Sequence, residues 1–300
     1  MTTTTTELRA VPGRLDTVVA RLLDVPRAEV QRAIEAGGVL VDGSPRTKAH
    51  RLAGGERLTV DLTEVRAVEP ESPAVPVRWR DRHLAVVAKP AGIPTHPTEG
   101  RRSGTLVNRL LGMGLPLAPS ADPLRPGIVH RLDAGTSGLL VVALDEQARD
   151  RLSEMFRRHD VERRYLALVR GVPVHERFVV DAPLGRRGAR IRLDAATGRR
   201  AETGFRVLEP FARAALLEAT PRTGRTHQIR VHLSSVGHPI VGDARYGGGG
   251  DDARRLGLSR PFLHSWRVGF AHPFTGERID VEDPLPEDLA EVLRRVRGEA

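Results

Sequence analysis

The sequence predicts two folded domains: a small module of two helices and short strands, then a larger domain that mixes strands and helices in an α/β or α+β arrangement. A length of 300 residues fits about two domains. After residue 78, apolar runs of strand length are interleaved with helical patterns. Residues 64–77 are rich in proline and acidic side chains and show no periodicity, so we predict a linker there.

The small module is predicted to begin at Gly13. Residues 1–12 contain no apolar signal-peptide core, and we expect them to form a disordered tail. A first helix is predicted in GRLDTVVARLL because its apolar residues recur at i, i+3, i+4 and i+7. The residues of this buried face are Leu15, Val18, Val19 and Leu22.

A second helix and two short strands are predicted to complete the module, which then spans residues 13–63. Pro26 suits the first turn of this helix and Gly37 suits its C-terminal end, with Val30 and Ile34 on the apolar face. The runs GVLVDG and ERLTVDL are typical of short strands, and the first ends in an Asp-Gly turn.

The larger domain is predicted to contain several buried strands and at least two helices. EQARDRLSEMFRRHD has helical character, and the terminal PLPEDLAEVLRRVRG carries an apolar stripe with acidic residues first and arginines last, which suits the helix dipole. That stripe consists of Leu289, Val292, Leu293 and Val296. The strand-like runs are LAVVAKP, GLLVVALD, RRYLALVRG and RAALLEATP.

The charge of the chain favours a polyanionic partner. Its formal net charge is +9, and every basic residue except Lys48 and Lys89 is an arginine, which can form forked contacts with phosphate and stack on bases. Residues 13–62 are nearly balanced in charge, whereas residues 176–206 are rich in arginine. With no cysteine and no apolar run of ~20 residues, we expect a cytoplasmic protein without disulfides, thiolate metal sites or membrane spans.

Two segments carry the residues best suited to chemistry. In HRLDAGTSGLLVVALD, Asp133 stands where a turn leads into a buried strand, a place where an aspartate usually caps backbone groups. In the segment 220–247, a helix is predicted from about Thr226. His227 and Arg230 would lie one turn apart on this helix. An arginine at the edge of a core needs an acidic partner, and Asp133 is a candidate. The residues expected to face inward are Ile229, Leu233 and Val236.

Several ordered motifs resemble those of the RluA-type pseudouridine synthases. They are HRLDAGTSGLLVVA, RRYLALVRG, GRTHQIRVHLSSVGHPIVGDARYG, VVAKPAGIPTHP and FLHSWRVGFAHPFTGE, which together span residues 84–277. The module of residues 13–63 resembles an S4 RNA-binding domain. The resemblance implies an α+β chain. In it, a pseudouridine synthase domain with a mixed, largely antiparallel central sheet flanked by helices occupies residues 78–300.

The resemblance also implies roles for individual residues. Asp133 aligns with the catalytic carboxylate, Tyr165 with the aromatic residue that packs on the target base and assists proton transfer, and Arg230 with the basic partner of the aspartate. Arg131 is implied to assist extrusion of the uridine. The substrate-binding residues implied are Arg131, Arg225, His227 and Thr136.

These assignments fit the chemistry that the reaction requires. Moving uracil from an N1 to a C5 linkage on C1′ needs a nucleophile or a fixed negative charge, and a carboxylate provides both. An arginine partner keeps that carboxylate ionised despite burial. A uridine in folded RNA must leave its stack first. The residues leave open whether the aspartate acts on the sugar or on the pyrimidine ring, and the family's usual account favours a glycal route that begins at the sugar. The family implies structured ribosomal RNA as substrate, with transfer RNA as the alternative, and no cofactor or metal. We expect the enzyme to be a monomer.

Three other functions fit the sequence less well. A metal-dependent hydrolase is disfavoured because His227 and His232 are five residues apart rather than four, and His238 adds no ligand pattern; we interpret these histidines as capping residues of the pocket wall. A serine hydrolase using Ser137 fails because the nucleophile elbow requires glycine at the position of Leu139. A non-catalytic S4-type RNA-binding protein explains the charge but not the ordered motifs.

Overall fold

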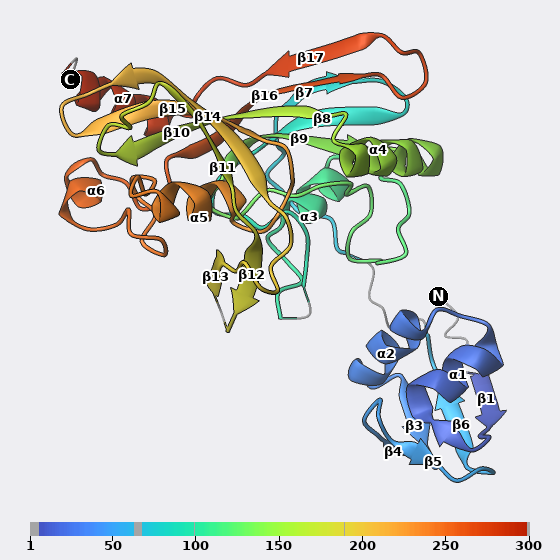
Figure 1. Cartoon of the computed structure of the whole chain (residues 1–300). Helices are drawn as coiled ribbons and strands as arrows, with labels where there is room; N and C mark the ends of the chain where they lie inside the picture. Colours follow the sequence, from blue (N-terminus) through green and yellow to red (C-terminus); the bar gives the residue numbers. More distant parts are fainter. Residues whose placement is uncertain (1–5, 63–67, 99, 189, 299–300) are drawn as a thin grey trace. The chain divides into compact units, whose positions relative to one another are not determined.

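The computed structural model describes residues 6–62, 68–98, 100–188 and 190–298, and the chain forms two compact units, residues 1–67 and 68–300 (Figure 1). Each unit has its own hydrophobic core. Within these described ranges, no helix is long and apolar enough to cross a membrane.

The N-terminal unit packs two helices on a four-stranded sheet. The helices α1 (Leu15–Leu23) and α2 (Arg27–Glu35) lie where the apolar periodicity predicts them, but Leu22 is 38% exposed because the last turn packs through Leu23 instead. The sheet has the order β1 (Thr6–Arg9), β6 (Arg57–Val60), β3 (Val39–Val41), β4 (Ser44–Pro45), and β2 (Gly13–Arg14) pairs separately with β5 (Arg51–Leu52).

The prediction that residues 1–12 form a disordered tail is wrong for Thr6–Arg9, because these residues form strand β1. This strand pairs with β6 in an antiparallel register, and Leu8 packs on the core of the unit. Residues 1–5 of the predicted tail lie outside the described residues. The Asp-Gly turn is as expected: Asp42 and Gly43 have φ of 48° and 77°, the left-handed pair that a two-residue hairpin turn requires.

A buried carboxylate joins the two helices of this unit. Asp16 is fully buried and accepts hydrogen bonds from Arg14 at 2.9 Å, Arg27 at 2.9 Å and Gln31 at 2.6 Å. Burial alone would raise the pKa of Asp16, but these donors outweigh it and hold the pKa well below its usual range. The charged network therefore fixes α1 against α2.

The C-terminal unit is built on a mixed, largely antiparallel sheet, as predicted. Its strands pair antiparallel except β16 with β9, which are parallel. The sheet has nine strands, with the following order: β11 (Arg177–Asp181), β14 (Glu202–Pro210), β15 (Ala214–Pro221), β10 (Glu162–Arg170), β16 (Leu263–Ala271), β9 (Ser137–Ala143), β8 (Leu84–Lys89) and β7 (Val77–Arg80), with β17 (Arg278–Glu282) beside β16.

Strands β8 and β9 are buried along their whole length because both faces of the sheet are covered there. Leu140 and Val142 join the core that contains helix α3 (Leu106–Gly112), while Leu139 and Val141 join a second core with α4 (Glu146–Arg158). Alternate side chains of one strand therefore serve different cores. The remaining elements are α5 (Gln228–Ser235), α6 (Asp251–Arg255), α7 (Glu287–Arg297) and the hairpin β12 (Leu184–Arg187) with β13 (Arg190–Leu193).

The predicted linker, residues 64–77, is partly wrong. Residues 64–67 lie outside the described residues, but Val68 and Val75 are buried in cores of the C-terminal unit. The backbone N–H of Glu71 donates to Asn108 O at 2.9 Å, and its carboxylate accepts from Gly104 N–H at 2.8 Å. The segment packs on this unit because Val68, Val75 and Glu71 contact it. The proline-rich composition of the segment gives no sign of these contacts.

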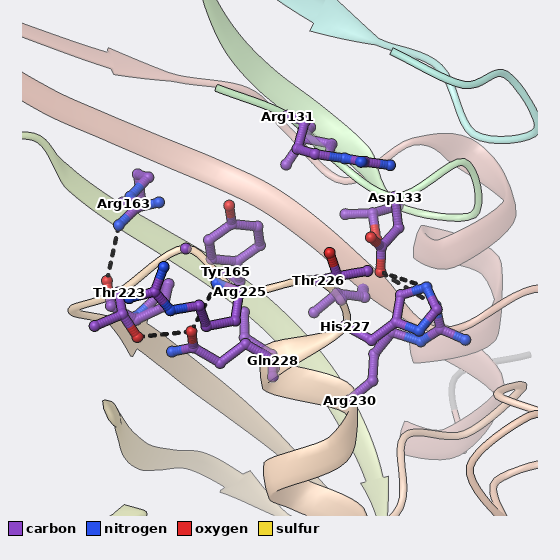
Figure 2. Close-up of a pocket in the computed structure, with 16 residues that line it drawn as sticks. Arg131, Asp133, Arg163, Tyr165, Thr223, Arg225, Thr226, His227, Gln228 and Arg230 are labelled. Atoms are coloured by element: carbon purple, nitrogen blue, oxygen red, sulfur yellow. Dashed lines mark hydrogen bonds and ion pairs between the residues drawn. The ribbon is translucent and has the colours of Figure 1, made fainter. Parts of the chain in front are cut away.

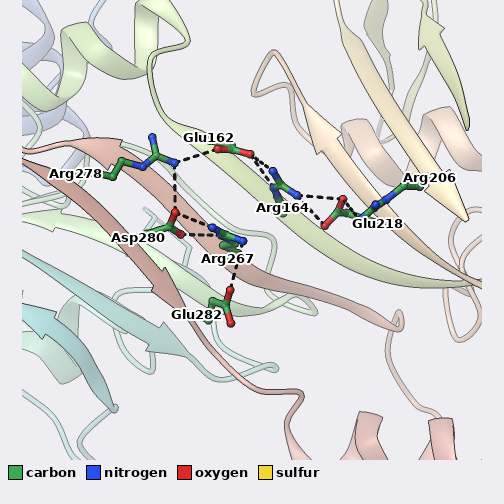
Figure 3. Close-up of polar contacts among 8 residues, drawn as sticks. All are labelled: Glu162, Arg164, Arg206, Glu218, Arg267, Arg278, Asp280 and Glu282. Carbon is green, nitrogen blue, oxygen red and sulfur yellow. Dashed lines mark hydrogen bonds and ion pairs between the residues drawn. The ribbon is translucent and has the colours of Figure 1, made fainter. Parts of the chain in front are cut away.

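One face of the sheet carries a ladder of alternating charges (Figure 3). Arg164 on β10 contacts Glu162 at 2.5 Å and Glu218 of β15 at 3.5 Å, and Arg267 on β16 contacts Asp280 of β17 at 2.7 Å. Successive residues of a strand point to opposite faces. The neighbouring positions of β10, Arg163 and Tyr165, therefore point to the other face.

Candidate active site

The loop that carries Asp133 is held from three sides just before β9. The hydroxyl of Thr95 donates to Leu132 O at 2.8 Å and accepts the Leu132 N–H at 3.1 Å. The Thr136 N–H donates to Asp133 O at 3.0 Å, and His130 Nε2 accepts the Val141 N–H at 2.8 Å. The sharp turn after Arg131 is thus fixed by its own backbone and by the strand that follows it.

Beneath this loop lies Lys89, a buried cation that the sequence interpretation did not single out. Its Nζ donates to the carbonyl oxygens of Pro90, Ile93 and Ala134 at 2.8, 3.0 and 3.3 Å. Burial lowers the pKa of Lys89 to about 7, although the negative charge of Asp133 acts to raise it.

Lys89 makes the stability of the protein depend on pH. Its pKa rises from about 7 in the folded chain to about 10.4 when unfolded, so between these values the unfolded state binds more protons. Relative to Lys89→Met, the wild type should gain stability from pH 7 to pH 9, by up to about 1.4 kcal/mol per pH unit. Urea unfolding of both proteins at several pH values tests this, and a constant difference would contradict it.

The start of α5 is set by a polar turn. Gln228 Oε1 accepts the Thr223 hydroxyl at 2.7 Å and the Arg225 N–H at 3.0 Å. The helix begins at Gln228, later than the predicted Thr226, and His227 precedes it with a left-handed φ of 56°. The expectation that Val236 faces inward is wrong: it follows the helix end and is 41% exposed.

Arg230 joins two carboxylates. Its Nη1 donates to Asp133 Oδ2 at 3.1 Å, which is the predicted ion pair. Its Nε and Nη2 donate to the two oxygens of Asp243 at 2.6 and 2.9 Å, a forked contact with a fully buried partner. Burial would lower the pKa of Arg230, but Asp243 and then Asp133 outweigh this and raise it. The sequence interpretation missed Asp243, although it stands in the same motif.

All of the predicted site residues line one pocket (Figure 2). Asp133 and His227 lie on one side of it and Tyr165 in the middle, with His227 Nε2 3.9 Å from Asp133 Oδ2. Arg131 is exposed, and Thr136 is buried. The predicted residues on the wall are Arg131, Asp133, Thr136, Tyr165, Arg225, His227 and Arg230.

Tyr165 and Arg163 give the pocket its aromatic surface and an additional cation. Burial raises the pKa of Tyr165, and the negative charge of Asp133 raises it further. The charge of Arg163 and a hydrogen bond with Ser265 lower the pKa by less, so the phenol is neutral at neutral pH. Arg163 is 8% exposed and donates to Pro221 O at 3.2 Å, while its buried Nε has no partner among the described residues. In the sequence, Arg163 stands in the RRYLALVRG motif and alternates with Tyr165 along the predicted strand.

The three histidines named in the sequence do not share a site, which corrects their interpretation as residues of one pocket wall. His227 lines the pocket, whereas His232 is buried between Thr203 Oγ1 at 2.9 Å and Ala182 O at 3.1 Å. His238 contacts Arg170 O at 3.0 Å. Over the residues that the structure describes, no three histidine or acidic side chains form a group that could hold a metal ion.

The fold and the pocket are those of an enzyme. A carboxylate fixed by an arginine lies in an arginine-lined pocket at one face of a mixed sheet. The family model described as RNA pseudouridylate synthase matches residues 83–235, and the S4 domain model matches residues 13–58. The chain belongs to the RNA pseudouridylate synthase family. Both the RluA-type resemblance and the predicted class of enzyme, an RNA pseudouridine synthase, are thereby confirmed.

Known proteins match nearly the whole chain. An uncharacterized RNA pseudouridine synthase of Mycobacterium bovis is 39% identical over 292 residues, which cover 95% of each chain. Ribosomal large subunit pseudouridine synthase D of Nitrosomonas europaea is 40% identical over 296 residues, covering 95% of this chain and 85% of the relative. The solved structure of human RNA pseudouridylate synthase domain containing 4 has 26% identity and a TM-score of 0.58, covering 74% of this chain and 92% of the human one.

Proposed function

We propose that the protein converts specific uridines of large-subunit ribosomal RNA to pseudouridine, with the carboxylate of Asp133 as the catalytic group acting on a flipped-out uridine. The observation that carries this proposal is the Arg230–Asp133 pair, 3.1 Å apart, in one pocket with Tyr165. The Asp133 side chain is 17% exposed, so it is accessible to a nucleotide and still shielded from bulk water.

The proposed reaction is an isomerisation, so the nucleotide gains and loses no atoms overall. The C1′–N1 bond breaks, the uracil turns within the pocket, and a C1′–C5 bond forms. C5 then loses its proton and N1 gains one. Asp133 supplies the negative charge or nucleophile that detachment from C1′ requires, and the hydrogen bond from Arg230 holds that carboxylate in position.

Base flipping is part of the proposal because Asp133 lies in the wall of a pocket. A stacked uridine cannot reach this partly buried carboxylate, so it must leave the helix, and the face of Tyr165 offers a replacement stacking surface. The exposed Arg131, next to the Asp133 loop, is suited to occupy the gap that the uridine leaves. Arg225, His227 and Thr136 complete the proposed binding wall.

The RNA backbone is proposed to bind the arginine-rich hairpin β12–β13. Its arginines are exposed, so they can neutralise phosphates and release condensed counterions. Within this hairpin they are Arg186, Arg187, Arg190 and Arg192.

Ribosomal RNA is proposed as the substrate because relatives of similar length carry that substrate in their names, as in Nitrosomonas europaea. Mapping pseudouridines in total RNA from cells with and without the gene tests this directly. We expect one or more positions to disappear from large-subunit ribosomal RNA; loss confined to transfer RNA would overturn the choice of substrate. We further expect a cytoplasmic monomer, which subcellular fractionation and light scattering can check.

The S4 domain is proposed to select the substrate. Deleting residues 1–67 leaves Val68 and Glu71 on the catalytic unit, which has its own core. The deletion should reduce activity on folded ribosomal RNA much more than on a short single-stranded uridine RNA. It should change the salt dependence only slightly, because the S4 region is nearly balanced in charge. Equal losses on both RNAs would contradict this division of labour.

A further inference from the structure

Tyr246 stands behind the active site and contacts both residues that approach Asp133. Its hydroxyl lies 2.7 Å from His227 Nδ1, and its ring faces the guanidinium of Arg230 at 5.0 Å. The same hydroxyl accepts the backbone N–H of Ile191, on strand β13 of the arginine-rich hairpin, at 3.4 Å. One side chain thus joins the hairpin to the surroundings of the catalytic carboxylate.

The hydrogen bonds along this path have one consistent direction. His227 Nε2 faces the carboxylate oxygen Asp133 Oδ2, which favours the tautomer with the proton on Nε2. Nδ1 therefore accepts the Tyr246 hydroxyl proton, while the Tyr246 oxygen accepts the Ile191 N–H. A neutral imidazole with Nδ1 as acceptor carries its proton on Nε2. That nitrogen faces Asp133 Oδ2 at 3.9 Å, so a donor rather than a lone pair points at the carboxylate.

The backbone also shows that His227 is held in place. Its φ of 56° lies in the left-handed region, which a non-glycine residue adopts only where its surroundings impose it. Tyr246 packs edge-on against the imidazole, with ring centroids 5.5 Å apart. Tyr246 and Ile191 also pack on a small core formed by Leu184, Ala201 and Val231, which includes residues of the hairpin and of α5.

We propose that Tyr246 is a positioning residue that couples the seating of the RNA-binding hairpin to the orientation of His227 and Arg230 on Asp133. The inference rests on the proposed catalytic role of Asp133. Phosphates bound by the hairpin arginines would hold β13 against Tyr246, and the carboxylate would then be fully oriented only when RNA is present.

The protonation state of His227 reports on this coupling. The charged groups that face it are Asp133, Arg230, Asp243 and Arg245, and burial is the main cause that lowers the pKa of the imidazole. A donor at Nδ1 stabilises the neutral ring further. Removing the Tyr246 hydroxyl should therefore raise the pKa of His227.

Tyr246→Phe tests the proposal, since it removes the hydroxyl and keeps the ring against Arg230. On a folded ribosomal RNA we expect kcat to fall about fivefold, the effect of one oriented hydrogen bond, while KM changes less than about twofold. NMR titration should show a higher His227 pKa than in the wild type. The matched control is Ser235→Ala, which removes a hydroxyl from the other end of α5 and should leave kcat, KM and the His227 pKa unchanged.

A second variant, His227→Gln, completes a double-mutant cycle and tests the other end of the same hydrogen bond. His227→Gln should lower kcat by a similar factor, and the double variant should lose no more than either single one. Additive losses, a change in KM alone, or an unaltered His227 pKa in Tyr246→Phe would overturn the coupling. Activity retained by Asp133→Asn would instead overturn the proposed function itself, so the two failures can be distinguished.

Discussion

Replacing Asp133 by asparagine is expected to abolish pseudouridine formation, with kcat reduced by roughly 10³-fold or more, as when a catalytic nucleophile is removed. Asparagine has nearly the same shape as aspartate, and its amide oxygen can still accept the Arg230 hydrogen bond seen at 3.1 Å. Arg230 also keeps its forked contact with Asp243, so no buried charge loses its partner. The change therefore removes the negative charge and leaves the fold.

Release of tritium from C5-labelled uridine RNA measures turnover in this experiment. RNA affinity and the thermal unfolding midpoint of Asp133→Asn serve as controls, and both should stay close to the wild-type values. Activity within tenfold of the wild type would contradict the assignment of Asp133.

The sequence was most informative where side chains are apolar or tied to a motif. The runs that became β8 and β9 were recognisable because strands covered on both faces must be apolar throughout. The Arg230–Asp133 pair could be predicted because a buried arginine needs an acid and the motif supplied one.

Other parts of the fold left weak signals. The strand β1, TELR, alternates Thr6 and Leu8 with two charged residues and contains one large apolar side chain, so it resembles a tail. Its pairing with β6 depends on a partner about fifty positions away. The charged ladder of Figure 3 left no such signal. Strands were predicted in RRYLALVRG and RAALLEATP, but the ion pairs of Arg164 and Arg206 with Glu218 join different strands, and the sequence does not show which strands are neighbours.

The site residues that were missed stand within the quoted motifs, but they act from behind the pocket or, like Arg163, form part of its wall. Asp243, Lys89 and Tyr246 do not line the pocket, and each acts through a contact that depends on how the chain folds. Periodicity and spacing carry no information about such pairings. The close approach of Asp243 to Arg230 depends on how the loop after α5 folds back.

The second large effect is expected from Arg230→Met. It should lower the free energy of unfolding by about 3–5 kcal/mol, because Asp243, whose side chain is 1% exposed, would be left as a buried charge without its partner. Activity should fall at least about 100-fold, since Asp133 would lose its Arg230 contact as well. Urea unfolding and tritium release measure the two effects separately.

A double variant separates the structural from the catalytic role of Arg230. Adding Asp243→Asn to Arg230→Met removes the unpaired buried charge, so most of the lost stability should return. Activity should not, because Asp133 still lacks the guanidinium that holds it at 3.1 Å. If the double variant regained activity together with stability, Arg230 would act only on the fold. If Arg230→Met unfolded at the wild-type urea concentration, the buried pair with Asp243 would contribute little to stability, and the cost of an isolated buried carboxylate would have to be relieved by water entering beside α5.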